Sequence, residues 1–241
     1  MLQFKRWLKI VRRMWAAGFL RPVLVSSIAV GMAVLPGCSS KMPPVLPALP
    51  VVRHTPTLAA VARSLCRIHT HCRCTFFATL KLQHQQISMI GRLNLISATN
   101  FQLTAADEFG RMLFLVRRRP GHPNTVQAAT GIPSRFALAI AQDIVISLLP
   151  PAHSSSPLLW RVLSPLHAVR LSYTDALGHI HHCLFTGSEG YLRRADITLA
   201  NHQCLQVLYS RYNATGFPRK LWIRQPAQGW LLMLDFTGSH G

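Results

Sequence analysis

The feature that most constrains the fold is a long series of strand-like runs with only two helical segments among them. From residue 74 onward, apolar and β-branched runs recur about every dozen residues, and polar turns such as residues 83–85 and 108–110 separate them. This spacing is typical of antiparallel strands that follow one another in a meander. Because too few helices alternate with the strands, the pattern excludes a parallel α/β sheet.

The expected strands form two groups on either side of an apolar helix. Ser134 is expected to N-cap this helix, which runs through Leu148, and residues 57–68 form a short amphipathic helix before the first strand. Residues 117–124 are a loop by their Pro and Gly content. The expected strands cover residues 74–82, 86–96, 101–107, 111–117, 167–175, 179–187, 190–199, 204–213, 219–225 and 229–236.

The last of these strands indicates how the sheet is covered. Trp230 and Leu232 share one face of it, yet Leu231 and Met233 on the other face are also apolar. A sheet with one solvent-exposed face does not need apolar side chains on both faces, so something apolar must cover or enter the sheet. A sheet of this length either curls or splits, and we therefore expect it to curl around the apolar helix.

The N-terminal segment has the properties of an export signal. Six Lys and Arg residues and no acid precede Cys38, and residues 23–35 form an uncharged, mostly apolar run. This run is shorter than the roughly 20 residues that a membrane-spanning helix needs, and it fits the h-region of a signal that follows a positive n-region. The sequence does not decide between Met1 and Met14 as the start, since Met14 leaves a shorter n-region that carries only Arg21.

The residues Leu35-Pro36-Gly37-Cys38 resemble the lipobox of bacterial lipoproteins. The resemblance implies that residues 1–37 are a lipoprotein signal peptide and that Cys38 becomes the acylated first residue of the mature protein. Two or more acyl chains, such as palmitate, give stable membrane anchoring. The residue after Cys38 is Ser39 and not Asp, which resembles a signal for forwarding to the outer membrane. Residues 38–56 are a Pro-rich tether. The alternative is an uncleaved membrane helix with Cys38 incidental.

The charge is strongly basic, but its distribution does not point to nucleic acid. The chain has 26 Lys and Arg against 7 Asp and Glu, a net charge of +19. Without the six basic residues before Cys38, 20 basic and 7 acidic residues remain, a net charge of +13. These are scattered apart from residues 117–119 and 193–194, whereas nucleic-acid binders show basic stripes with interleaved aromatics. We expect no nucleic-acid partner, and surplus Arg suits lipid phosphates.

Two segments carry a resemblance to a known superfamily. These are "GRLNLISATNFQLTAADEFGRMLFLV" (91–116) and "GFPRKLWIRQPAQGWLLMLDF" (216–236). They resemble the lipoprotein-localisation factors LolA and LolB and their wider superfamily, over roughly residues 57–238. The resemblance implies that residues 57–241 form a mainly β (α+β) domain, an antiparallel, incompletely closed half-barrel with a helical lid and an N-terminal helix. It also implies an apolar cavity for an acyl chain or lipid.

Alternation along the strands indicates which side chains face such a cavity. The alternative for each of them is an ordinary packed core. The candidates are Phe101, Leu103, Met112, Phe114, Trp222, Trp230 and Leu232 on the sheet, with Phe136, Leu138 and Ile140 on the lid.

Two clusters of His and Cys offer other chemistry, "HTHCRC" (69–74) and "HIHHC" (179–183). Such side chains bind zinc or copper, but no C-x-x-C pair is present and the spacing matches no four-ligand pattern, so we expect no metal and no cofactor. No G-x-S-x-G, phosphate-binding loop or H-E-x-x-H motif is present, which favours a protein that is not an enzyme. Since an exported protein can form disulfides, Cys66 could pair with Cys72 or Cys74, and Cys183 with Cys204. The sequence does not decide the connectivity.

Together these patterns predict a non-enzymatic outer-membrane lipoprotein on the periplasmic face, held in the membrane through Cys38. It binds an acyl chain, a lipid or a lipidated protein, in lipoprotein or lipid trafficking to the outer membrane. The first alternative is a structural or assembly lipoprotein that binds an envelope protein partner and has no ligand cavity. A hydrolase or metal-binding protein that uses the His and Cys clusters is the second.

Overall fold

The computed structural model describes residues 45–49, 53–67, 72–82, 85–149, 159–163 and 166–240. The predicted signal peptide, Cys38 and most of the Pro-rich tether lie outside the described residues. Neither helix of the described part has the length and apolar character that crossing a membrane requires.

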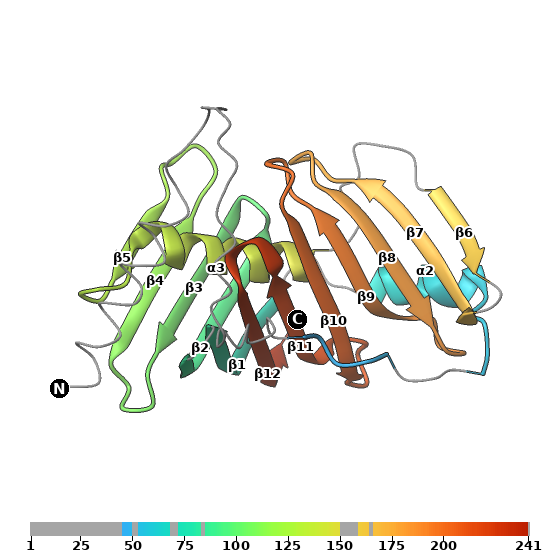
Figure 1. Ribbon diagram of the computed structural model, residues 1–241, viewed down its shortest axis with the longest axis horizontal. Coiled ribbons are helices and arrows are strands. Elements are labelled where there is room, and N and C mark those ends of the chain that lie inside the picture. Colours follow the sequence, from blue (N-terminus) through green and yellow to red (C-terminus); the bar gives the residue numbers. More distant parts are fainter. Residues whose placement is uncertain are drawn as a thin grey trace, which may run out of the picture.

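The described strands form one antiparallel sheet of twelve strands (Figure 1), in the order β5-β4-β3-β2-β1-β12-β11-β10-β9-β8-β7-β6. The first and last of the described strands, β1 and β12, pair at the middle of this sheet, and β5 and β6 are its two edges, so the sheet does not close. The strands are β1 (Cys72–Leu82), β2 (Gln85–Ser97), β3 (Asn100–Ala106), β4 (Met112–Arg118), β5 (Thr125–Ala128), β6 (Leu159–Leu163), β7 (Ala168–Thr174), β8 (Ile180–Thr186), β9 (Tyr191–Thr198), β10 (Cys204–Tyr212), β11 (Pro218–Gln225) and β12 (Trp230–His240).

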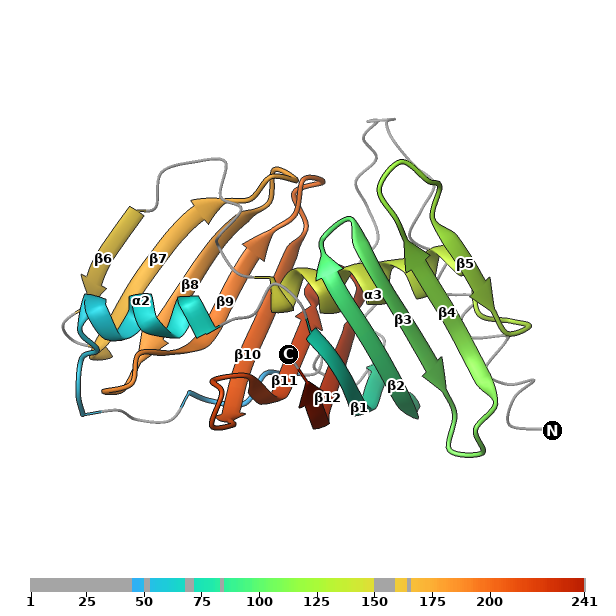
Figure 2. The same cartoon turned by 180° about the vertical axis from the view of Figure 1, so that it is seen from behind.

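Two longer helices cover different parts of the sheet, and a short 3₁₀ turn, η3 (Pro226–Gln228), joins β11 to β12. Helix α3 (Ser134–Leu148) packs against β4, β5 and β11, and α2 (Leu58–Arg67) packs beside β9. Figures 1 and 2 show α3 running across the strands in the middle of the sheet, whereas α2 lies over the β7–β9 flank. The predicted mainly β, incompletely closed half-barrel with two helices is confirmed.

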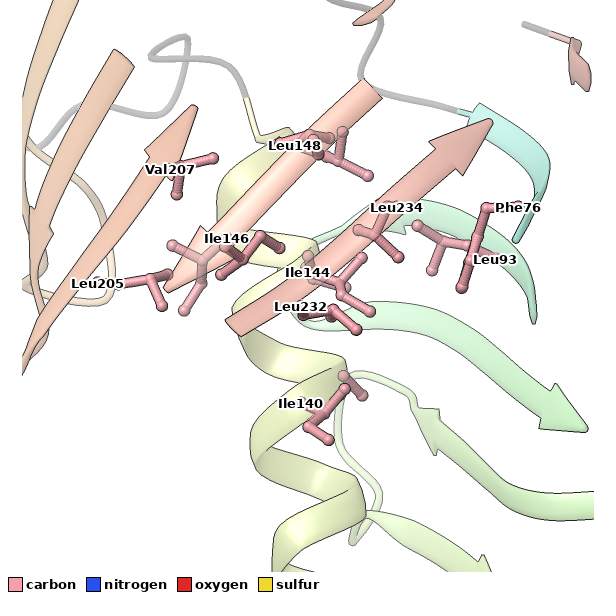
Figure 3. Close-up of a cluster of buried hydrophobic side chains, with 14 of the residues drawn as sticks. Phe76, Leu93, Ile140, Ile144, Ile146, Leu148, Leu205, Val207, Leu232 and Leu234 are labelled. Atoms are coloured by element: carbon pink, nitrogen blue, oxygen red, sulfur yellow. The ribbon is translucent and has the colours of Figure 1, made fainter. Parts of the chain in front are cut away.

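Burial follows the strand alternation, and α3 is part of the core. On β1, Phe76 is buried while its neighbour Phe77 is exposed on the other face. Ten residues of α3 are buried, because a helix with apolar side chains on most sides lowers its free energy by lying inside the core. Figure 3 shows Ile140 and Ile144 of α3 beside Leu232 of β12, so helix and sheet share one apolar cluster.

Two strands were missed by the sequence analysis, and one predicted helix cap is wrong. The edge strands β5 and β6 were not predicted, because runs of only four and five residues give little signal in the sequence. Ser134 is the first helical residue and not the N-cap. Pro133 occupies the N-cap without a side-chain hydrogen bond, and its carbonyl accepts the N–H groups of Phe136 and Ala137 at 2.9 and 3.2 Å.

The disulfides that the sequence leaves possible are not formed by the cysteines that the structure describes. Cys72, Cys74, Cys183 and Cys204 hold free thiols. Cys183 lies on β8 and Cys204 on β10, and β9 runs between these strands. Two strand spacings amount to about 9.5 Å, whereas the Cα atoms of a disulfide lie at most about 7 Å apart. The side chain of Cys66 lies outside the described part of the chain.

Candidate functional site

The side chains predicted to line a cavity lie mostly in the packed core. The buried ones are Phe101, Leu103, Phe114, Phe136, Ile140, Trp230 and Leu232, and Leu138 is partly buried. They belong to the cluster that joins α3 to the sheet, so the middle of the half-barrel is filled by the chain itself. Whether any of them binds a ligand stays a prediction.

Met112 and Trp222 do not face this interior. A β-bulge between β3 and β4 pairs Phe114 with Ala105 but Met112 with Ala106, so Met112 moves to the opposite face and is 45% exposed. Trp222 alternates with buried neighbours on β11 and is only half-buried on the other face. The Nζ atom of Lys220 lies 5.8 Å from the centre of its ring.

Two adjoining hollows lie at the C-terminal end of α3. One has a volume of about 330 Å³ and the other about 210 Å³, and they share Ala98 and Leu177. The walls come from α3 and from the β2–β3, β7–β8 and β9–β10 hairpins, which Figure 1 shows at the same edge of the molecule. Of the predicted ligand-binding residues, Phe101 alone lines either hollow. The site is therefore displaced from the centre that the sequence indicated.

The lining of the hollows is mixed. The larger hollow has apolar walls from Phe101, Val145 and Leu199, and Leu149 and Tyr173 line the smaller one. Arg118 is the one Lys or Arg side chain among the residues lining the two hollows. The other ionisable groups of the lining are mainly two carboxylates and two imidazoles, those of Asp143, Asp175, His179 and His181.

The β7–β8 hairpin positions one of these carboxylates, Asp175. Its Oδ1 accepts the backbone N–H groups of Leu177 and His179 at 2.8 and 2.9 Å, and Gly178 adopts a φ of 80° to complete the turn. A turn of this kind favours Asp or Asn at its first position and Gly at its fourth. The hairpin sequence thus holds the carboxylate in one orientation.

The second oxygen of Asp175 faces two imidazoles. His179 Nδ1 lies 2.9 Å from Oδ2 and His181 Nε2 lies 3.0 Å from it. His181 is only 2% exposed and stacks on the ring of Tyr173, with centroids 4.5 Å apart. Burial acts to raise the pKa of Asp175, but hydrogen bonds from the two histidines outweigh it and hold the pKa well below its ordinary value.

A second carboxylate, Asp143, enters the larger hollow from α3. It is 5% exposed, and no described residue donates a hydrogen bond to its carboxylate. Burial raises its pKa to about 7, and the charge of His179 opposes this in part. A carboxylate in such a place gains from any cation or donor that enters the hollow.

The sequence analysis found part of this cluster and missed the rest. The "HIHHC" segment contributes His179 and His181, but His182 lies on the other face, where its Nδ1 is 2.8 Å from Ser172 Oγ. Asp175 stands where an ordinary turn has Asp, so no local pattern in the sequence identifies it as a site residue. Asp143 had one usable signal, a lone acid in the apolar run "IAQDIVIS". His69 and His71 of the other cluster lie outside the described residues.

No protein-family model and no curated protein matches the sequence. Among solved structures, a LolA superfamily protein, NE2245 from Nitrosomonas europaea, is similar with a TM-score of 0.50 and 8% identity, over 74% of this chain and 92% of that one. A DUF1329 family protein from Desulfovibrio piger gives a TM-score of 0.50 and 10% identity, over 77% and 93%. These likenesses show the fold, and the predicted LolA-like architecture is confirmed at that level.

Proposed function

We propose that this protein is a lipid-anchored envelope protein that binds an acyl chain, a lipid or a lipidated protein through the two hollows beside α3. Acylation of Cys38 would hold it in the outer membrane on the periplasmic face, where it would serve lipoprotein or lipid trafficking. The observation that carries the proposal is the pair of adjoining, partly apolar hollows at the rim of a LolA-like half-barrel.

The size of the hollows sets what they can take without rearrangement. Ligand sites in proteins usually measure about 300–1,000 Å³, and the larger hollow is at the lower end of that range. A longer chain would have to displace the core around Ile140 and Ile144, so binding would move α3 away from the sheet. Each methylene that leaves water contributes about 0.8 kcal/mol toward that rearrangement.

The direct test is lipid analysis by mass spectrometry of the full-length chain purified as the Cys38→Ala variant. We expect a defined lipid or fatty acid at near-stoichiometric amounts. Finding only trace lipid of mixed composition would contradict a carrier role.

A variant of one turn residue makes this test specific for the hollows. Leu177 lies on a hairpin turn and lines both of them, so Leu177→Trp fills the space at little cost to the fold. We expect its affinity for a fluorescent fatty acid to fall at least about tenfold, since the lost burial exceeds 1.4 kcal/mol. The control is Phe109→Trp, at the equivalent position of the Asp107 turn, where the side chain is exposed. Equal affinity in both variants would contradict the assignment.

A second candidate function, binding of an envelope protein partner, is favoured by the β6 edge. Leu159 and Val162 are 68% and 56% exposed there, and Trp160 is also exposed. An edge strand with apolar side chains can pair with a strand of another chain. With a photo-crosslinking residue in place of Val162, this function predicts one discrete protein adduct in cells, and none when the same residue replaces Gln127 on the β5 edge. No adduct at residue 162 would contradict it.

A further inference from the structure

Asp175, His179 and His181 bring three metal-ligand atoms together at the smaller hollow and its border with the larger one. The ligand atoms of the three side chains all lie within 4.8 Å of one another. Asp175 Oδ2 is at the centre of the group, 2.9 Å from His179 Nδ1 and 3.0 Å from His181 Nε2. Two imidazole nitrogens and one carboxylate oxygen are a common ligand set for zinc and similar divalent ions.

The hairpin turn does not account for this cluster. The same turn occurs at Asn213, where a neutral amide Oδ1 accepts the N–H groups of Thr215 and Phe217 at 3.1 and 2.8 Å. It occurs again at Asp107, whose remaining oxygen pairs with Arg111 at the surface. Neither turn has two imidazoles on one oxygen, so the turn needs only the first oxygen of Asp175.

A second, independent feature points to a cation at this place. Asp143 comes from α3, far from the hairpin in sequence, and it lines the same hollow as His179. Asp143 is 5% exposed, accepts no hydrogen bond from a described residue on its carboxylate, and presents that carboxylate to the hollow that it lines. The whole chain has 7 acidic residues against 26 Lys and Arg, yet one acid lines each of these adjoining hollows, Asp143 the larger and Asp175 the smaller. A mostly buried carboxylate at the wall of a hollow is stabilised by a cation or donor that joins it there.

We propose that Asp175 Oδ2, His179 Nδ1 and His181 Nε2 bind a divalent transition-metal ion of the zinc class, with Asp143 as the nearby carboxylate that balances its charge. This reverses the expectation from the sequence that no metal is bound. In a tetrahedral zinc site with bonds of about 2.0–2.1 Å, ligand atoms lie about 3.3 Å apart. The present contacts of Asp175 therefore need to lengthen by only a few tenths of an ångström. With three protein ligands, a four-coordinate ion would keep one position for water or another ligand.

The test is a titration of the full-length Cys38→Ala protein with Zn²⁺, monitored by calorimetry. The protein is first treated with EDTA and dialysed. We expect one saturable site and a rise in melting temperature on addition of Zn²⁺. Asp175→Asn keeps the turn, as Asn213 shows, but removes the anionic ligand. We expect this variant and His181→Ala to weaken Zn²⁺ binding at least about tenfold.

Because the chain has 12 histidines, adventitious binding needs a matched control. His182→Ala removes the neighbouring imidazole on the opposite face, and it should leave the affinity unchanged. The absence of saturable binding in the parent protein would overturn the proposal. Equal affinity for Zn²⁺ in Asp175→Asn and the parent protein would overturn it as well. If Asp143→Asn binds Zn²⁺ as tightly as the parent protein, Asp143 is not part of the site. These outcomes do not depend on lipid binding, which the Leu177→Trp variant tests separately.

Discussion

Replacing Gly190 with alanine is expected to lower the free energy of unfolding by about 4 kcal/mol. Gly190 has a φ of 66°, where an L side chain costs about 1–2 kcal/mol. A Cβ atom there would lie 2.7 Å from the backbone N of Val61 and 2.8 Å from the backbone C of Ala60. These atoms belong to α2, and overpacking adds about 1–3 kcal/mol.

The backbone at Ala60 and Val61 cannot shift within α2 to make room for this methyl group. The N–H of Val61 donates to the Thr57 carbonyl at 3.1 Å, and the N–H of Ala60 donates to Thr57 Oγ1 at the same distance. Val61 and Ala60 are both fully buried. We therefore expect the variant to release α2 from the sheet before the rest of the domain unfolds, which trypsin cleavage at Arg63 would report.

Gly187 provides a matched control in the same turn. It has a φ of 78°, and a Cβ atom there meets nothing within 4 Å. Gly187→Ala should cost only the backbone strain, about 1 kcal/mol. Urea unfolding of both variants measures the difference. Similar losses of stability in the two variants would show that contact with α2 does not determine the effect.

Replacing Gly91 with alanine is expected to cost about 3 kcal/mol. Gly91 pairs with Phe76 across β1 and β2, and a Cβ atom would lie 2.1 Å from Cζ of that ring. The ring cannot move away freely, because Phe76 is buried and packs edge-on against Phe236 with centroids 5.7 Å apart. Inserting one carbon into such a core forces neighbours out of their rotamers.

A double-mutant cycle identifies the ring as the cause of this loss. In a Phe76→Leu background the clashing ring atoms are absent, so adding Gly91→Ala should change the free energy of unfolding by less than about 0.5 kcal/mol. Ser88→Ala, on the exposed face of β2, controls for alanine in this strand. If the effects of Gly91→Ala and Phe76→Leu simply add, the close approach of ring and glycine is not the source.

The elements that the sequence predicted are those with a clear period. The run "SRFALAIAQDIVISL" corresponds to α3 because its apolar residues are too dense for an exposed helix and too long for a strand. The central strands were found because they alternate between core and surface. The β3–β4 bulge gives no such signal, and one extra residue was enough to turn Met112 to the opposite face.

The sequence by itself determined an antiparallel β-domain built around one apolar helix, because periodicity is a property of neighbouring residues. It also predicts a signal peptide and an acylated Cys38, which lie outside the described residues. Only the tertiary structure decided that the centre is filled and that the hollows lie at the rim. It also brought Asp143 of α3 to the Asp175 hairpin, and β1 to β12. Such contacts join residues far apart in the chain, so no local pattern records them.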